Sequence, residues 1–192
     1  MKIAILSGST RLHRQSHRVA LALQQWLQTH TPHEVEVLDL AEYRFPVLEE
    51  VFHRHPHPPA GLEEFARRVR QADAYLFVSP EYNGSYTAAL KNAVDYLKDR
   101  EFAHKVVGVV SVSAGALGGI RGGMAMQQLV LGLWGYTIPQ MLTVGQVQQR
   151  FDEQGRLLDA AFEKTIGQFM QDFLWLAEAV TEKRRSEVAM LH

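Results

Sequence analysis

Short runs of apolar and β-branched residues alternate with longer segments of helical periodicity along the whole chain. The runs have the length of strands, and the segments between them repeat apolar residues at i, i+3 and i+4, which predicts helices. Strands that alternate with helices in this way form a parallel sheet with helices on both faces. The predicted strands are residues 2–6, 34–40, 74–78, 105–112 and 141–144; the predicted helices are residues 16–28, 62–71, 86–97, a segment ending near 134, and 160–180.

The number of strand–helix pairs narrows the fold class. Five pairs favour a flavodoxin-like three-layer α/β sandwich, with a five-stranded parallel sheet in the order 2-1-3-4-5, over the six-stranded dinucleotide-binding fold. The 192 residues contain no internal repeat, low-complexity tract or dividing linker, so we expect one domain over residues 1–192. Prolines in residues 41–59 predict an irregular excursion, and the residues from about 181 onward predict a solvated, flexible tail.

The composition excludes several classes of function. A net charge of −1 argues against general nucleic-acid binding, which needs a broad basic surface. The absence of cysteine rules out disulfides, thiolate metal sites and cysteine nucleophiles. The first apolar run is too short for a signal peptide, and no run of about 18 apolar residues predicts a membrane span. We therefore expect a cytoplasmic protein with no role for nucleic acid or a membrane.

Three loops are the candidates for a ligand site. In open parallel sheets, ligands bind beyond the carboxyl ends of the strands, where the strand order reverses. The loops after the first, third and fourth predicted strands read GSTRLHRQS, SPEYNGSY and SVSAGALGG. All three carry hydroxyls, glycines or amides, and these groups suit ligand binding.

The first loop predicts a phosphate site. Ser16 stands where a helix N-cap belongs, so the amides after it would point outward with the positive end of the helix dipole. The hydroxyls of Ser9 and Ser16 and the fork of Arg11 would add donors. Neither the P-loop motif nor G-x-G-x-x-G occurs, which favours a mononucleotide. The alternative is that Ser16 only caps its helix and the arginines lie in solvent.

The other two loops predict a seat for a flat ring. Pro80 bends the chain after the third strand, and the turn at Tyr82-Asn83-Gly84 can present backbone amides to a heterocycle such as a flavin. Glycines in the third loop, beside Ser113, would let a planar ligand approach the backbone closely. A simple strand-to-helix turn is the alternative for the second loop, and glycine richness alone is a weak signal for the third.

Together the segments GSTRLHRQSHRVA, SPEYNGSYTAALKNAVDYL and SVSAGALGGIRGG resemble the signatures of the NADPH-dependent FMN reductase family, which is flavodoxin-like, over roughly residues 1 to 175. The resemblance implies tightly held, non-covalent FMN, NADPH or NADH as co-substrate, and a homodimer or homotetramer with the helix after PEYN in the interface. It implies that phosphate is held by Ser9, Arg11, Ser16 and the Gln15 main chain, that the isoalloxazine is lined by Pro80, Glu81, Tyr82, Asn83 and Gly84, and that the pocket is closed by Ser113, Ala114 and Gly115. One departure is Thr87, where many relatives have proline, and we expect it to leave flavin binding intact.

The resemblance also implies the chemistry. We expect an oxidoreductase with ping-pong turnover, in which NAD(P)H delivers hydride to flavin N5 and leaves before a quinone, azo compound, metal oxyanion or free flavin is reduced. No side chain need act as a general base, so we assign no catalytic residue. The alternatives are a flavodoxin-like electron carrier and a non-catalytic nucleotide-binding regulatory protein. The sequence leaves open the acceptor, the choice between NADPH and NADH, and the choice between dimer and tetramer.

A few residues outside the three loops have competing interpretations. His53, His55 and His57 alternate with other residues in the proline-rich excursion, but no acidic partner supports a metal site, and a loop over residues 43–59 that shapes the acceptor site is the favoured interpretation. Asp39 ends the second strand and is interpreted as structural because the dinucleotide motif is missing. Trp134 and Trp175 lie in apolar phase, which predicts core or dimer contacts.

Overall fold

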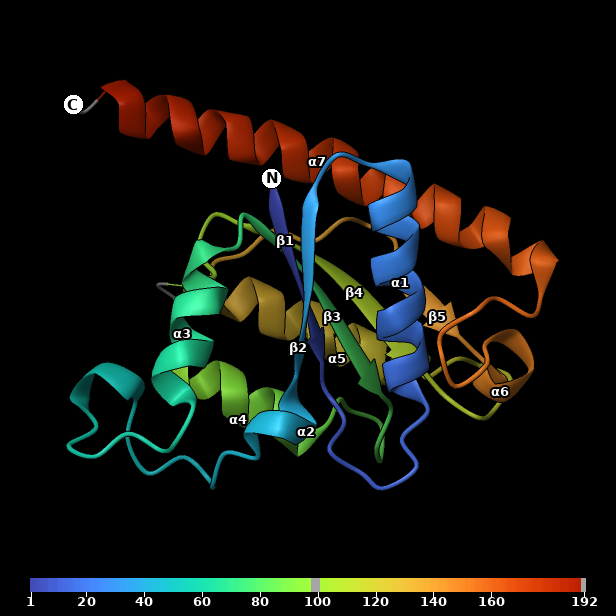
Figure 1. Cartoon of the computed structure of the whole chain (residues 1–192), viewed down its shortest axis with the longest axis horizontal. Helices are drawn as coiled ribbons and strands as arrows, with labels where there is room; N and C mark the ends of the chain where they lie inside the picture. Colours follow the sequence, from blue (N-terminus) through green and yellow to red (C-terminus); the bar gives the residue numbers. More distant parts are fainter. Residues whose placement is uncertain (98–100, 191–192) are drawn as a thin grey trace.

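The computed structural model describes residues 1–97 and 101–190 and contains one five-stranded sheet (Figure 1). All neighbouring strands are parallel, and their order is β2-β1-β3-β4-β5, as predicted. The strands are β1 (Lys2–Ser7), β2 (Glu34–Asp39), β3 (Ala74–Pro80), β4 (Val106–Val112) and β5 (Leu142–Val144). This order puts the carboxyl ends of β1, β3 and β4 next to one another, which brings the three predicted loops to one edge.

Helices cover both faces of the sheet because alternate strand residues point to opposite faces. Ile3 and Ile5 belong to the core beneath α1 (Ser16–His30) and α7 (Glu163–Met190), whereas Ala4 and Leu6 belong to the core beneath the helices of the other face. Those other helices are α3 (Leu62–Gln71), α4 (Ala88–Leu97) and α5 (Ile120–Gly132). Full burial of each large aliphatic side chain stabilises this sandwich by about 1.5–3 kcal/mol.

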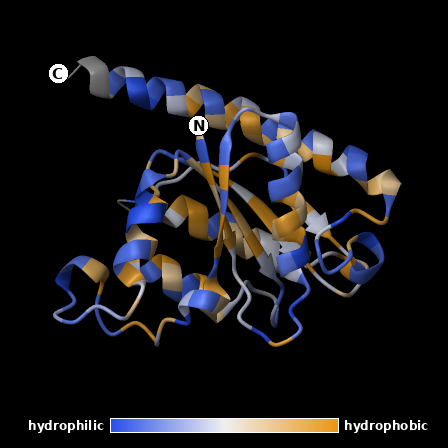
Figure 2. Cartoon of the chain, viewed as in Figure 1, coloured by the Kyte–Doolittle hydropathy of each residue, from blue (hydrophilic) through white to orange (hydrophobic). Residues whose placement is uncertain are grey.

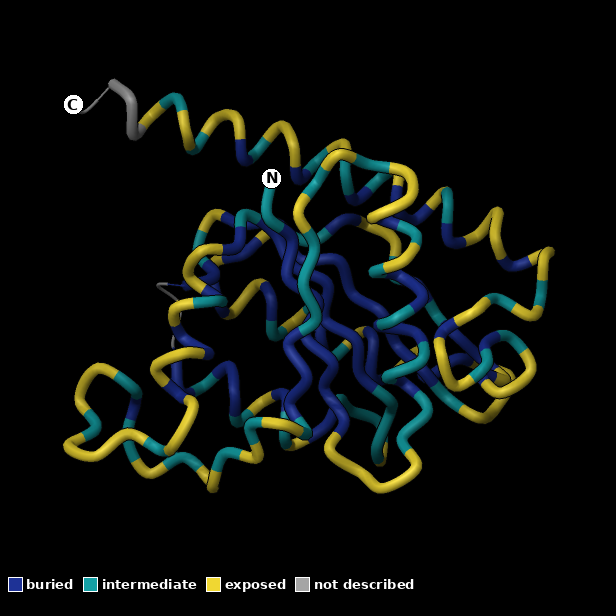
Figure 3. Tube along the Cα trace, viewed as in Figure 1, coloured by how far each residue is buried: buried dark blue, intermediate teal, exposed yellow. Residues whose placement is uncertain are grey.

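Hydropathy follows the same layering. The strands at the centre are mostly apolar, and the outer faces of the helices and most loops are hydrophilic (Figure 2). The tube view gives the matching burial: the sheet is buried, and the loops at its carboxyl edge are largely exposed (Figure 3). Within the described residues, no helix has both the length and the apolarity that crossing a bilayer requires.

Several local predictions need correction. The excursion over residues 41–59 contains a turn of helix, α2 (Leu40–Tyr43), and a 3-10 turn, η1 (Phe52–Arg54). The predicted helix over 160–180 begins as a 3-10 turn, η3 (Ala160–Phe162), and a short helix, α6 (Val147–Arg150), precedes it without having been predicted. These elements are too short to show a periodicity in the sequence.

The C-terminal segment is helical where a flexible tail was predicted. Helix α7 continues past residue 181 to Met190, and Figure 1 shows its last turns extending beyond the edge of the sheet. The Nη2 atom of Arg185 lies 2.8 Å from Oδ2 of Asp73, so the helix is tied to the start of β3. Asp73 and Arg185 are 112 residues apart in the sequence, so no local pattern predicts this contact.

The two tryptophans do not lie in the core. Trp134 is 69% exposed and Trp175 is 74% exposed, so the core interpretation is wrong for both. The buried positions of α7 are instead filled by Phe169 and Phe173, which pack on the sheet. Dimer contacts of the tryptophans stay a prediction.

Candidate functional site

A cavity of about 420 Å³ opens at the carboxyl edge of the sheet. Its volume lies within the range of small-ligand sites. The loops after β1, β3 and β4 all contribute to its walls, as the strand order requires. Of the predicted site residues, Asn83 and Gly84 do not line the cavity. The others do: Ser9, Arg11, Gln15, Ser16, Pro80, Glu81, Tyr82, Ser113, Ala114 and Gly115.

The first turn of α1 forms one end of the cavity. Gln15 occupies the N-cap position with helical backbone angles and makes no side-chain cap, and Ser16 is the first helical residue, so the predicted capping role of Ser16 is wrong. Ser16 is only 1% exposed, yet among the described residues its Oγ has no hydrogen-bond partner, and neither has Oε1 of Gln15. A buried polar atom without a partner costs about 1–3 kcal/mol. Ser16 lines the cavity, so an anion bound at this helix end would accept from its hydroxyl and offset the cost for that group, whereas the amide oxygen of Gln15 is an acceptor and needs a donor.

The cations of the first loop are not equivalent. Arg14 pairs with Asp39, and Arg18 lies 3.5 Å from Glu153. Arg11 has no carboxylate partner among the described residues, and its guanidinium lies 5.6 Å from the centre of the Tyr82 ring. Arg11 is therefore the cation of this loop that remains available to an anion.

Arg14 closes the first loop on itself. Its Nη1 atom donates to the carbonyl oxygen of Ser9 at 2.9 Å, and its two Nη atoms contact both carboxylate oxygens of Asp39. Asp39 also accepts from the backbone N–H of Ala41 at 3.0 Å, which caps α2. This set of contacts ties the ends of the loop to the end of β2, consistent with the structural role predicted for Asp39. We call the Arg14–Asp39–Ser9 contacts the loop clamp.

His17 lies beneath the same loop. Its Nδ1 atom is 3.0 Å from Oγ of Ser7 and 3.7 Å from Oδ2 of Asp39. Burial lowers the pKa of His17 below its ordinary value, although the carboxylate of Asp39 opposes the shift. The imidazole is therefore neutral at pH 7 and adds no charge to the anion site.

The second loop makes a tight turn beside the cavity. Tyr82 and Ser85 exchange backbone hydrogen bonds of 2.8 and 3.1 Å, and Asn83 and Gly84 between them both have positive φ. A Cβ atom on Gly84 would lie 2.2 Å from Nη2 of Arg121, so the turn packs against the start of α5. Asn83 and Gly84 thus shape the loop from behind, and Tyr82 lines the cavity.

Glu81 and Ser113 have internal partners. Oε2 of Glu81 accepts from the backbone N–H groups of Arg121 and Gly122 at 3.1 and 3.2 Å, which stabilises the positive end of α5. Oγ of Ser113 donates to the carbonyl oxygen of Gly115 at 2.9 Å. The main-chain groups and aromatic rings of these loops therefore remain as the ligand-facing surface.

The glycine pair of the third loop serves the turn. Gly118 and Gly119 have φ of 63° and 76° and do not line the cavity. A Cβ atom on Gly119 would lie 2.5 Å from Oγ of Ser111, whose hydroxyl donates to the Gly119 carbonyl oxygen. Their conformational freedom lets the chain turn from β4 into α5, so the predicted close approach of a ligand is not their function in the fold.

Thr87 caps the helix after the second loop. Its Oγ1 accepts from the N–H of Leu90 at 3.1 Å and donates to the carbonyl oxygen of Gly8, and its own N–H donates to Oγ of Ser79 at 3.1 Å. Proline at this position would lack both the hydroxyl and the N–H. The threonine therefore joins the first and second loops directly.

The family comparison agrees with this geometry. The sequence profile of the NADPH-dependent FMN reductase family matches residues 1–149. The chain belongs to this family. Family membership confirms the predicted resemblance and oxidoreductase class, and it supports FMN and NAD(P)H as the cofactor and reductant.

Individual members of the FMN reductase family align over most of the chain. An NAD(P)H-dependent FMN reductase of Pseudomonas aeruginosa is 32% identical over 183 residues, which cover 92% of this chain and 95% of that protein. A quinone reductase of Pseudomonas putida is 32% identical over 164 residues, covering 82% and 84%. Among solved structures, the NAD(P)H:acceptor flavoenzyme FerB of Paracoccus denitrificans superposes with a TM-score of 0.76 at 21% identity, covering 93% and 97% of the two chains, and this likeness confirms the fold.

The structure adds lining residues that the motifs did not predict. Leu12, His13 and Arg14 come from the first loop, Val112 ends β4, and Val147 and Gln148 come from α6. The last pair lies after β5, at the same carboxyl edge as the other loops. That edge rule applied to β5 is the signal that would have found them.

Proposed function

We propose that the chain binds FMN in the 420 Å³ cavity and uses NADPH or NADH to reduce a small-molecule acceptor. The observation that carries the proposal is the unpartnered, buried hydroxyl of Ser16 at the start of α1, beside the unpaired Arg11. A monoester phosphate would satisfy this hydroxyl and draw on the helix dipole. Family membership supports the same ligand.

The residues of the cavity would divide the work by position. The phosphate would be held by the backbone N–H groups at Gln15 and Ser16, the Ser16 hydroxyl and the Arg11 guanidinium. The Ser9 hydroxyl, which lies 3.3 Å from the Tyr82 hydroxyl, would connect the phosphate end of the cavity to the ring end. The Tyr82 loop and residues 113–115 would enclose the isoalloxazine. When bound, FMN would supply an atom, N5, that can take up hydride, and a source of two electrons for the second substrate. No side chain is assigned a proton-transfer step.

We propose ping-pong turnover because one face of the same ring would serve both substrates. The proposed acceptors are quinones, azo compounds, metal oxyanions and free flavin. Quinone reductases from Pseudomonas putida and an azoreductase from a Bacillus species are among the relatives, which supports the first two classes. In this proposal the protein binds the flavin ring and leaves one of its faces accessible to both substrates.

Anaerobic titration tests the proposal. Purified protein loaded with FMN is mixed with NADPH, and the loss of the oxidised flavin absorption is followed; addition of a naphthoquinone should then restore it. Arg11→Met should weaken FMN binding about tenfold by removing a charged hydrogen bond, and should leave riboflavin binding unchanged. The matched control is Arg67→Met, an exposed position on α3 outside the cavity, whose side chain donates to Oε1 of Gln71 at 3.3 Å. Oxidised flavin that persists under saturating NADPH and NADH refutes the reductase function.

We further propose that the chain works as a homodimer or homotetramer. Ile120, Met124 and Leu131 of α5 are large apolar side chains exposed to solvent, and Trp134 follows them. A second copy is the proposed occupant of this face, together with the neighbouring α4. Light scattering after size exclusion should give at least twice the 21.7 kDa mass of one chain, and Met124→Glu should shift the protein toward the monomer. A monomeric wild type at micromolar concentration would contradict the proposal. A cytoplasmic location also stays a proposal.

A further inference from the structure

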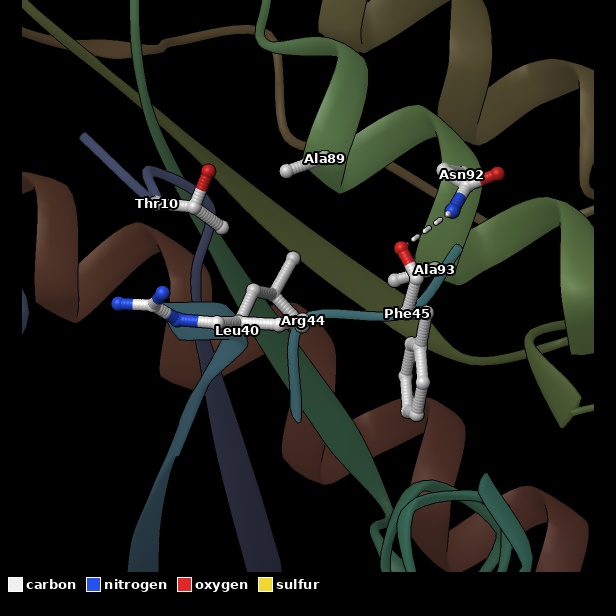
Figure 4. Close-up of a pocket in the computed structure, with 7 residues that line it drawn as sticks. All are labelled: Thr10, Leu40, Arg44, Phe45, Ala89, Asn92 and Ala93. Carbon is white, nitrogen blue, oxygen red and sulfur yellow. Dashed lines mark hydrogen bonds between the residues drawn. The ribbon is translucent and has the colours of Figure 1, made fainter. Parts of the chain in front are cut away.

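A second cavity, of about 280 Å³, is lined by residues of the first loop, of α2 and the segment after it, and of α4 (Figure 4). Ser9 and Arg11 line the FMN cavity, whereas Thr10 between them lines this second one. The backbone of residues 9–11 therefore borders both cavities. We call the second one the Thr10 cavity. A ligand there would lie one loop-width from the proposed flavin.

One part of the Thr10 cavity is apolar and rigid. Leu40 is buried at its base, and Ala89 and Ala93, one turn apart on α4, leave space because their side chains are small. Asn92 is fully engaged: Oδ1 accepts from the N–H of Leu48 at 2.8 Å, and Nδ2 donates to the carbonyl oxygen of Pro46 at 2.7 Å. The asparagine therefore builds the wall and offers no free group to a ligand.

The other part of the Thr10 cavity carries a cation. Arg44 ends α2 in the left-handed region with φ of 46°, held by a hydrogen bond from its N–H to the carbonyl oxygen of Leu40 at 3.1 Å. The Nε atom donates to the carbonyl oxygen of Ala41 at 3.0 Å, so the side chain is anchored at its base and both Nη atoms remain open.

Arg44 and Thr10 are the free polar groups of this cavity. Within residues 1–97 and 101–187, Arg44 has no carboxylate partner, and the Thr10 hydroxyl makes no hydrogen bond. Figure 4 shows both side chains on the same side of the cavity, away from the ring of Phe45. A guanidinium with two open Nη atoms matches two oxygens of a phosphate or sulfonate, and the hydroxyl can donate to a third.

We infer that the Thr10 cavity binds an oxyanion carried by one of the two substrates of the reductase, with Arg44 and Thr10 as its donors. The inference rests on the proposed function. The oxyanion is either the 2′-phosphate of NADPH or an acidic group on the acceptor, and the apolar wall of Leu40, Ala89 and Ala93 takes the carbon skeleton that carries it. Arg44 thereby becomes a specificity-determining residue for charged over uncharged substrates.

Two matched substrate pairs separate the sources of the oxyanion. FMN-loaded wild type, Arg44→Gln, Arg44→Lys and the control Arg67→Gln are compared in steady state with NADPH against NADH, and with a sulfonated against an unsulfonated naphthoquinone. Glutamine removes the charge and the two Nη atoms, and its amide nitrogen stands where the Nε atom of arginine contacts Ala41. Lysine restores the charge without the two-pronged guanidinium. Binding of adenosine 2′,5′-bisphosphate against 5′-AMP is measured by calorimetry on the same proteins, which gives a readout independent of turnover.

The expected result is a rise of about tenfold in KM for the charged member of one pair in Arg44→Gln, with the uncharged member unchanged and partial recovery in Arg44→Lys. A change confined to NADPH and to the bisphosphate assigns the 2′-phosphate; a change confined to the sulfonated quinone assigns the acceptor. Equal effects within both pairs, no effect, or the same effect in Arg67→Gln overturns the inference. If wild type oxidises neither nicotinamide, the proposed function fails by itself, and bisphosphate binding still decides whether this cavity takes a phosphate.

Discussion

The loop clamp gives the most decisive test of how the phosphate end is built. Asp39→Asn keeps the size of the side chain and its ability to cap α2, but it removes the charge that faces Arg14. The two side chains are 18% and 9% exposed, so the pair is largely removed from water. Breaking a buried pair by removing one partner costs about 3–5 kcal/mol, and the remaining exposure of Arg14 favours the lower end. At an m-value of about 2 kcal/mol per molar urea, the unfolding midpoint should fall by about 1.5 M.

The effect on FMN binding distinguishes two roles for Arg14. If Arg14 is a phosphate ligand, then Asp39→Asn frees a cation next to the phosphate and should tighten FMN binding, whereas Arg14→Met should weaken it. If Arg14 acts through the clamp, holding the Ser9 carbonyl at 2.9 Å, both variants should loosen the loop and weaken FMN binding. We expect the second outcome, because both Nη atoms already contact the Asp39 carboxylate.

A double-mutant cycle completes the test. Dissociation constants for FMN and riboflavin are measured by flavin fluorescence for wild type, Asp39→Asn, Arg14→Met and the double variant. The clamp predicts that FMN affinity falls about tenfold or more in each single variant, that riboflavin affinity changes little, and that the double variant is no worse than either single one. Glu153→Gln is the control, since it removes the carboxylate near Arg18 at a position 79% exposed and should cost less than about 1 kcal/mol. Additive losses, or tighter FMN binding in Asp39→Asn, would refute the clamp.

Three further changes test other parts of the fold. Burial lowers the pKa of Lys105 from 10.5 to about 8, and its Nζ lies 2.8 Å from the Tyr75 hydroxyl. The unfolded chain therefore binds more protons than the folded chain above pH 8, and the free energy of unfolding should rise by up to about 2 kcal/mol between pH 8 and 9.5. In Lys105→Met, the free energy from urea unfolding should not change over that interval. Above pH 10 the raised pKa of Tyr75 acts in the opposite direction, which is why the measurement stops at 9.5. Thr87→Val should lose about 1 kcal/mol of stability without weakening FMN binding, and Thr87→Ser should restore it; an unchanged melting temperature would contradict the cap. Gly119→Ala should lower the free energy of unfolding by about 1–3 kcal/mol in thermal unfolding, because φ is 76° and the new Cβ would lie 2.5 Å from the Ser111 hydroxyl oxygen. Gly132→Ala is the control and should cause no loss, since a Cβ there has no atom within 4 Å.

The strands of the sheet and the location of the site can be predicted from the sequence because both follow from local patterns. Continuous apolar runs such as residues 74–78 identify buried parallel strands without any tertiary information. Once the strand order is known, the edge rule alone selects the loops after β1, β3 and β4, and the cavity lies where they meet. The residues predicted from the motifs therefore line the cavity, with the exception of Asn83 and Gly84.

Positions that depend on tertiary pairing are beyond local patterns. Ser16 has the residue type of an N-cap, but the helix begins at Ser16 itself because Gln15 already has helical angles. Asn83 and Gly84 have the residue types of a turn, and which way the turn faces is set by Arg121, far along the chain. The partner of Arg14 is 25 residues away, at the end of another strand. For the turn and for Arg14, the local signal is correct in kind, and the residue that the position contacts lies far along the chain.

The pairing of cations decides which phosphate ligand the first cavity favours. Of the three arginines between the end of β1 and the first turns of α1, Arg14 and Arg18 face carboxylates, so one unpaired guanidinium and one buried, unpartnered hydroxyl remain. A pyrophosphate spreads its charge over two phosphorus centres, whereas a phosphate monoester concentrates its charge on one, where a single guanidinium and a hydroxyl at a helix end can contact it together. The remaining donors match a single phosphate monoester, which is the terminal group of FMN. Arg44, which also has no carboxylate partner among the described residues, lines the Thr10 cavity and not the first one, so we expect it to meet a second molecule.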